Sequence, residues 1–240
     1  MRGICVGERV LLAGQTGMGK TTLAEYIVEG LQPIRTIVYD PKGELDVGVE
    51  PVSSISELGE ALRAPMCHFI PERLDRDTLE ESFELIWALP GPWLLRLDEA
   101  ASVSSASWIP EGLRLTATQG RQPRKMLIAC TQRLSECHPV LRSQSEHIII
   151  LVPAPIELDL KTIAGHIGRD PGQLRAILEQ LEAEYGPYSH LWYLRTGNEL
   201  RRCAPLLPPD GSGRPATHED GESSESAELP TVAVSEEPIP

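Results

Sequence analysis

The chain has 240 residues, of which 41% are hydrophobic, so it is long enough to bury a core without the help of disulfides or metals. Its formal net charge of -13 argues against a surface that is basic throughout, as expected of many nucleic-acid-binding proteins. No apolar run approaches the length of a membrane span and the first residues lack a signal-peptide pattern, so we expect a soluble, intracellular protein with no direct membrane span.

The acidic charge is concentrated at the C-terminal end. Between Pro208 and Pro240, eight acidic residues accompany one arginine, which gives this segment a charge of -7 and leaves -6 for the rest of the chain. The segment is rich in Pro, Gly, Ser and Glu and poor in large apolar residues, a composition typical of disorder. We therefore expect one folded domain at residues 1–207 and an acidic disordered tail at residues 208–240. The folded domain is only mildly acidic, so its composition does not exclude a basic groove within it.

Apolar runs separated by turn residues alternate between strand and helix patterns. The chain order predicts strands at residues 10–13, 35–39, 66–70, 93–97, 125–131 and 148–152, and helices at residues 22–28, 56–63, 77–89 and 110–119. Residues 153–207 are expected to pack on this core as two helices within 158–184, divided near Gly168, and a hairpin of strands 191–195 and 200–203. The alternation predicts an α/β fold with a largely parallel sheet between helices.

The first motif lies between the first strand and the first helix. The run Gly14-Gln15-Thr16-Gly17-Met18-Gly19-Lys20-Thr21 has the G-x-x-x-x-G-K-[ST] spacing of a phosphate-binding loop. Its glycines allow consecutive N–H groups to converge on phosphate oxygens, Lys20 can reach the β and γ phosphates, and the Thr21 hydroxyl can hold Mg²⁺. A glycine-rich turn that carries a lysine by chance is the alternative, which the flanking strand and helix disfavour. The motif therefore predicts a nucleotide site.

The second motif is a pair of acids at the end of a buried strand. Asp98 and Glu99 follow an apolar strand at the edge where α/β sheets bind their ligands. Because this pair lies downstream of a phosphate-binding loop, we expect Asp98 to bind Mg²⁺ and Glu99 to orient the water that attacks the γ-phosphate. Arg96 is unusual within such a strand, and we expect it to form a structural ion pair with an acid near the site.

The third motif is Gln132, which ends the strand at residues 125–131. Its amide can donate a hydrogen bond to the γ-phosphate or hold the attacking water. A glutamine that simply ends a strand is the alternative.

Four segments in this order resemble the FtsK and HerA superfamily of DNA-translocating ATPases, over residues 7–205. They are Gly14 to Thr22, Val38-Tyr39-Asp40-Pro41-Lys42-Gly43-Glu44, Leu97-Asp98-Glu99-Ala100 and Ile128-Ala129-Cys130-Thr131-Gln132-Arg133. The Asp-Pro-Lys-Gly-Glu turn is the discriminating segment. From the residues alone it is a turn with an exposed Lys42, whereas the resemblance places it near the nucleotide or a subunit contact.

The resemblance implies a RecA-like P-loop NTPase fold in which the Gln132 strand lies between the phosphate-loop strand and the Asp98 strand. It also implies that ATP and Mg²⁺ are the cofactors, with ATP held by Gly14, Gln15, Thr16, Gly17, Met18, Gly19, Lys20, Thr21 and Thr22. Rings of about six such subunits complete each site with an arginine from a neighbour. Arg121 matches that arginine best, and Arg124 is the alternative. From the residues alone, their cluster is a solvated basic loop or a phosphate-contacting patch.

Within the superfamily, a bare motor of this size resembles the genome-packaging ATPases of membrane-containing icosahedral viruses. That resemblance implies a motor that pumps double-stranded DNA into a preformed capsid, in the host cytoplasm or at a virion vertex, with capsid or portal-vertex proteins as partners. The alternatives are a cellular or plasmid-borne translocase and an assembly factor like the zonula-occludens-toxin-like proteins of filamentous phages, which normally carry a membrane segment. A small-molecule kinase is disfavoured because Asp98, Glu99 and Gln132 fit water activation better.

Overall fold

The computed structural model describes residues 3–206, and the expected tail at residues 208–240 lies outside this range. Its strands are β1 (Arg9–Ala13), β2 (Thr36–Tyr39), β3 (Met66–Phe69), β4 (Trp93–Leu97), β5 (Lys125–Thr131), β6 (His147–Leu151), β7 (His190–Leu194) and β8 (Glu199–Cys203). Its α-helices are α1 (Lys20–Leu31), α2 (Ile55–Ala61), α3 (Arg76–Ala88), α4 (Glu111–Gln119), α5 (Pro139–Gln144), α6 (Glu157–Ile167) and α7 (Pro171–Tyr185).

The strands form one sheet in the order β3-β2-β4-β5-β1-β6-β7-β8. The first six strands pair in parallel, whereas β7 pairs antiparallel with both β6 and β8. The α/β fold with a largely parallel sheet and a C-terminal hairpin is therefore confirmed. The expected place of the Gln132 strand is confirmed too, because β5 lies between β1 and β4.

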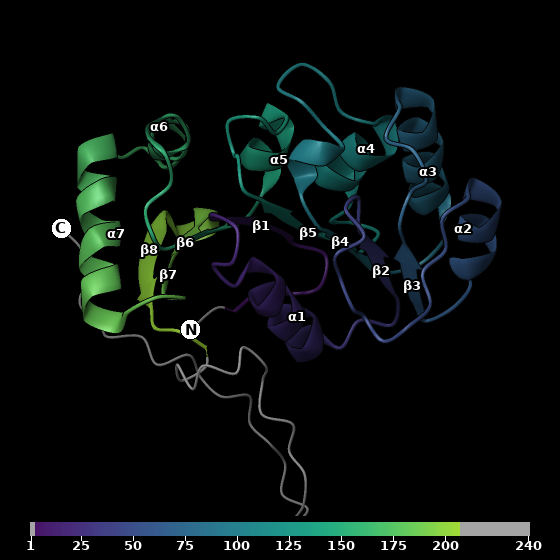
Figure 1. Cartoon of the computed structure of the whole chain (residues 1–240), viewed down its shortest axis with the longest axis horizontal. Coiled ribbons are helices and arrows are strands. Elements are labelled where there is room, and N and C mark those ends of the chain that lie inside the picture. The colour runs from purple at the N-terminus through teal and green to yellow at the C-terminus, as the bar shows by residue number, and fades with distance from the viewer. Residues whose placement is uncertain (1–2, 207–240) are drawn as a thin grey trace, which may run out of the picture.

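Helices cover both faces of the sheet, with α1 on one side and α2 to α5 on the other (Figure 1). The strand pleat explains the two cores, because neighbouring residues point to opposite faces. In β1, Leu11 belongs to the larger core, to which α2 through α7 contribute, while Leu12 packs with Leu23, Ala24 and Ile27 of α1. The central strands are buried on both faces and are apolar almost throughout, as parallel strands under helices must be.

This topology gathers the ends of five strands at one edge of the sheet. The carboxyl ends of β4, β5, β1 and β6 lie side by side there, and the antiparallel β7 begins at the same edge. Ligands of α/β proteins bind outside the carboxyl ends of such strands. The loops at this edge therefore form the candidate site.

Candidate nucleotide-binding site

The phosphate-binding loop joins β1 to α1 and leaves the first turn of the helix uncapped by any side chain. Gly17 and Gly19 have φ angles of 77° and 83°, a left-handed backbone that glycine adopts without strain. Because α1 begins at Lys20, its first N–H groups face the loop and can bind an anion. Lys20 Nζ donates to the carbonyls of Gly14 at 2.8 Å and Gln15 at 2.9 Å, so the ammonium lies over the loop. The loop residues thus have the conformation and donors that a nucleotide's phosphates require.

Lys20 lies at the centre of the site, partly buried and close to other charged side chains. Burial lowers the pKa of Lys20, and the positive charge of Lys42 acts in the same direction, whereas Glu99 and Asp98 oppose it. The charged side chains of Lys42, Glu99 and Asp98 therefore lie close enough to Lys20 to influence it. Two lysines and two carboxylates at one edge of the sheet match the charges needed around a nucleotide triphosphate and Mg²⁺.

Asp98 directly follows β4 and is half-buried. Burial raises the pKa of its carboxyl, while the guanidinium of Arg96, two residues earlier on the same face, opposes that shift. Arg96 forms the expected ion pair, with Nη1 at 3.2 Å from Glu25 Oε1 on α1. The Arg96 side chain is 3% exposed, and its Nε and Nη2 have no hydrogen-bond partner among the described residues. A buried positive charge therefore lies behind the carboxylate that we expect to bind Mg²⁺.

Glu99 is held by three donors, two at the end of β5 and one in the turn after β2. Its Oε1 accepts hydrogen bonds from Thr131 Oγ1 at 3.0 Å and from the backbone N–H of Gln132 at 3.2 Å, and Lys42 Nζ lies 3.4 Å from Oε2. The residue is 7% exposed and has a φ of 62°, a left-handed backbone that is rare outside glycine. Strained backbone of this kind is concentrated at functional sites. The carboxylate is therefore fixed toward the loops that end β5 and β2.

The turn after β2 is organised by Asp40, which is fully buried. Its Oδ1 accepts from the N–H groups of Lys42 at 3.2 Å and Gly43 at 2.8 Å, and its Oδ2 accepts from Leu45 N–H at 2.9 Å. His68 Nε2 lies 3.4 Å from Oδ2. The Asp-Pro-Lys-Gly-Glu segment is thus a rigid turn that directs Lys42 to Glu99, a contact that the sequence did not predict.

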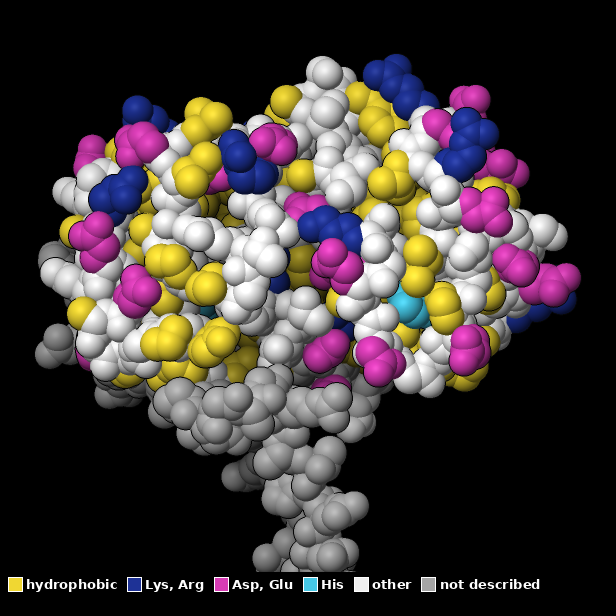
Figure 2. All heavy atoms as spheres, viewed as in Figure 1, with side chains coloured by type: hydrophobic (Ala, Val, Ile, Leu, Met, Phe, Trp, Pro, Cys, Tyr) yellow, Lys and Arg dark blue, Asp and Glu magenta, His cyan; other side chains and the backbone are white. Residues whose placement is uncertain are grey.

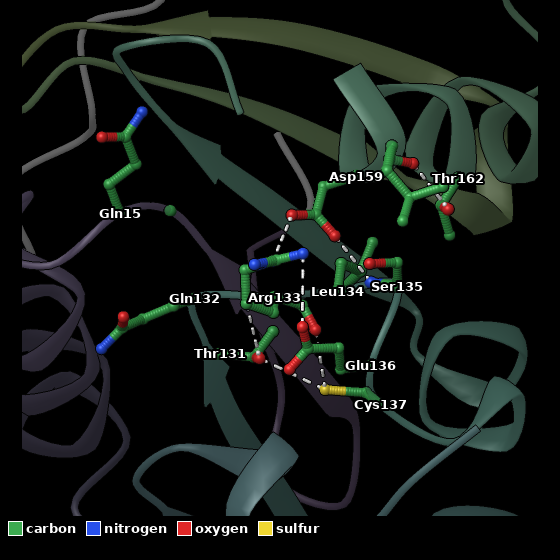
Figure 3. A network of polar contacts seen from close by, with 12 residues as sticks. Gln15, Thr131, Gln132, Arg133, Leu134, Ser135, Glu136, Cys137, Asp159 and Thr162 are labelled. Carbon is green, nitrogen blue, oxygen red and sulfur yellow. Dashed lines mark hydrogen bonds and ion pairs between the residues drawn. The ribbon is translucent and has the colours of Figure 1, made fainter. Parts of the chain in front are cut away.

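Gln132 follows β5, and its side chain extends away from a polar network formed by the residues after it (Figure 3). In this network Arg133 Nη2 lies 3.2 Å from Glu136 Oε1, and Arg133 Nε lies 3.3 Å from Asp159 Oδ2 on α6. Asp159 also accepts a hydrogen bond from the N–H of Ser135 at 2.8 Å. The loop that carries Gln132 is therefore tied to α6 through Asp159, a contact that the sequence motifs did not indicate.

Arg121 and Arg124 lie in the turn before β5 and are exposed. Gln132 follows the other end of the same strand, which has seven residues, so the two arginines lie about 20 Å from this chain's own site. The structure does not bring either of them to the phosphate loop of the same chain. If either arginine acts at a nucleotide, that nucleotide must belong to a neighbouring subunit.

No protein-family model matches the chain, and no curated protein sequence matches it. Solved structures do, and several of them are RecA-like P-loop NTPases. The genome-packaging NTPase B204 of Sulfolobus turreted icosahedral virus 2, in complex with sulfate, matches with a TM-score of 0.69 and 18% identity, covering 85% of this chain and 99% of that chain. The same NTPase in complex with AMPPCP gives a TM-score of 0.67 and 19% identity, covering 83% of this chain and 98% of that chain.

A further match is the pCW3 conjugation coupling protein TcpA with ATPγS, with a TM-score of 0.52 and 15% identity, covering 80% of this chain and 59% of that chain. These neighbours are P-loop ATPases of the FtsK/HerA type. The likeness establishes the fold and confirms the structural resemblance that the motifs predicted.

Proposed function

We propose that this chain is an ATP-hydrolysing motor that moves double-stranded DNA, and that its task is to package a viral genome into a preformed capsid. One observation carries the proposal. The phosphate loop, Asp98, Glu99 and Gln132 converge at one edge of a sheet whose fold is similar to a packaging NTPase over nearly the whole of that protein. Hydrolysis supplies the energy, and a ring of about six copies moves the duplex.

The proposed roles are consistent with the positions of these residues. The N–H groups from Gly14 to Thr22 and the ammonium of Lys20 hold the phosphates, and Thr21 and Asp98 hold Mg²⁺. The ion, when bound, neutralises charge that develops on the β and γ phosphates. Glu99 orients and polarises the attacking water, and Gln132 contacts the γ-phosphate. Arg121, or alternatively Arg124, stabilises the transition state in the site of a neighbouring subunit.

Charge on the described surface bears on how DNA would be bound. Figure 2 shows Lys and Arg side chains interspersed with Asp and Glu over this face, without one continuous basic patch. Proteins normally bind the phosphates of double-stranded DNA through clustered Lys and Arg side chains. We therefore expect the duplex to contact another face of the subunit, which a ring would turn toward its central channel.

The experiment that tests the proposal is an ATPase assay of the full chain with and without duplex DNA. Duplex DNA should stimulate phosphate release, and single-stranded DNA should stimulate it less. A matched chain that lacks residues 208–240 should retain the stimulation, because we expect that tail to be a linker or a capsid-docking segment outside the motor. Hydrolysis that no nucleic acid stimulates would contradict a DNA motor, and binding without hydrolysis would contradict an ATPase.

A plasmid-borne translocase is the second candidate, favoured by the similarity to the coupling protein TcpA. None of the helices among residues 3–206 is both long and apolar enough to cross a membrane. Neighbouring genes separate the two candidates, since capsid genes favour packaging and conjugation genes favour transfer. The partners of a plasmid-borne translocase would be conjugation proteins rather than capsid or portal-vertex proteins.

A further inference from the structure

Tyr188 lies beside the phosphate-binding loop although it is far from it in the sequence. The ring's Cδ1 is 3.1 Å from the position that a Cβ on Gly19 would occupy, and Leu151 lies near the same position. The Tyr188 side chain therefore packs on the loop at a place that only glycine leaves open. Nevertheless Tyr188 is 47% exposed, so part of this large aromatic side chain faces solvent next to Gly19.

The segment that carries this ring is braced on both sides. Tyr188 has a φ of 68°, a left-handed backbone that is a strained choice for an aromatic residue. The next residue, Ser189, is fully buried; its hydroxyl donates to Gly186 O at 2.7 Å, and its carbonyl accepts from Val152 N–H at 3.1 Å. The buried ring of His190 follows it, and the backbone of Tyr188 partly opposes the lowering of the His190 pKa by burial, so that ring lies against this segment. These contacts hold an unfavourable backbone in place and keep the aromatic ring against the loop.

Strand order fixes which part of a nucleotide would reach Tyr188. Glu99 and Gln132 follow β4 and β5, on one side of the phosphate loop, and β6 and β7 lie on the other side. Because β7 is antiparallel, Tyr188 lies just before its first residue at the same edge of the sheet. A γ-phosphate directed toward Glu99 leaves the ribose and base to extend over β6 and β7. In Figure 1 the connection from α7 to β7 starts at the lower end of α7, which is the end nearer α1.

We propose that the ring of Tyr188 stacks against the base of the bound nucleotide and so contributes to its affinity. This inference rests on the proposed nucleotide binding and adds to it the residue that receives the base. Every base has a π-face, so stacking tolerates different bases and gives little discrimination between ATP and GTP. Gly19 then has two reasons to be glycine, since it forms the phosphate loop and admits the ring of Tyr188.

The test is isothermal titration calorimetry of the full chain with two probes, ATP and inorganic tripolyphosphate, which has the phosphates but no base. Tyr188→Ala should weaken ATP binding about tenfold, the loss expected when one base loses an aromatic partner. Binding of tripolyphosphate should change less than about twofold, and Tyr188→Phe should bind ATP as the wild type does. Tyr26→Ala, which removes a similarly exposed tyrosine from α1, serves as the matched control and should bind both probes normally.

Tyr188→Gly guards against a folding defect, because glycine removes the ring and also relieves the left-handed backbone. Tyr188→Ala and Tyr188→Gly should both bind ATP more weakly, while their affinity for tripolyphosphate should stay close to that of the wild type. Unchanged ATP affinity would overturn the stacking while leaving nucleotide binding intact. An equal loss for ATP and tripolyphosphate would overturn it too, because Tyr188 would then only support the loop. A wild-type chain that binds neither probe would overturn both proposals.

Discussion

Replacing Glu99 with glutamine tests the centre of the proposed mechanism with little disturbance of the fold. The amide has the same shape, and its oxygen can still accept from Thr131 Oγ1 and the N–H of Gln132, as Glu99 Oε1 does at 3.0 and 3.2 Å. Only the contact with Lys42 at 3.4 Å loses its charge, and Lys42 is about one-third exposed, so the effect on stability should stay below about 1 kcal/mol.

The effect on hydrolysis should be far larger. An amide cannot take up a proton from water, and losing a positioned general base lowers a rate by about 10² to 10⁴-fold, or about 3 to 5 kcal/mol of barrier. ATP affinity should be equal or greater, because Glu99→Gln removes a negative charge that faces Lys20 and the phosphates. The variant should therefore separate binding from chemistry.

The assay measures ATP affinity by calorimetry and turnover by phosphate release, at saturating ATP. Glu111→Gln is the control, since Glu111 is an exposed residue at the start of α4, paired with Arg114, and it should hydrolyse at the wild-type rate. Turnover of Glu99→Gln within about threefold of the wild type would remove Glu99 from catalysis. A loss of ATP binding would instead show that Glu99 supports the loop.

Three further predictions follow from particular contacts. Arg121→Ala should be inactive alone and regain activity when mixed with Lys20→Ala in the same rings, and no rescue at any ratio would count against action between subunits. Gly112→Ala would place a Cβ on the backbone of α3 and should cost about 1 to 3 kcal/mol in urea unfolding, whereas Gly165→Ala, which meets open space on α6, should gain about 0.5 to 1 kcal/mol. Burial lowers the pKa of His190 to about 4. The neutral imidazole therefore contributes fully to stability above about pH 6.5, and this contribution is lost as the pH falls toward 4. The free energy of unfolding should drop by about 2 kcal/mol at pH 5, and by less in His190→Gln.

Sequence patterns predicted the central sheet well because its strands are buried on both faces. The bounds of β4 and β5 agree with the structure at both ends, since apolar runs limited by Gly, Pro or polar residues leave little choice of length. The phosphate loop follows from fixed spacing. By contrast, α5 (Pro139–Gln144) was not predicted, because six residues are too few to establish a helical period.

The contacts between loops could not be predicted. Lys42 and Glu99 are 57 residues apart, and their contact exists only because β2 and β4 pair side by side. Tyr188 precedes the last hairpin and belongs to no recognisable sequence motif. Its place beside Gly19 depends on the antiparallel direction of β7. Local patterns thus identified which loops carry charge, whereas tertiary pairing decided which side chains meet.

The position of Arg121 has a consequence for how activity depends on assembly. Among the described residues, Lys20 and Lys42 lie at the edge of the sheet that carries the phosphate loop, whereas Arg121 and Arg124 lie at the opposite edge. If the transition state requires an arginine from a neighbour, a dilute monomer should bind ATP with full affinity and hydrolyse it slowly. Specific activity should then rise with protein concentration as rings assemble, while ATP affinity stays constant. A specific activity independent of concentration, in a chain shown by sedimentation to be monomeric, would mean that each subunit completes its own site.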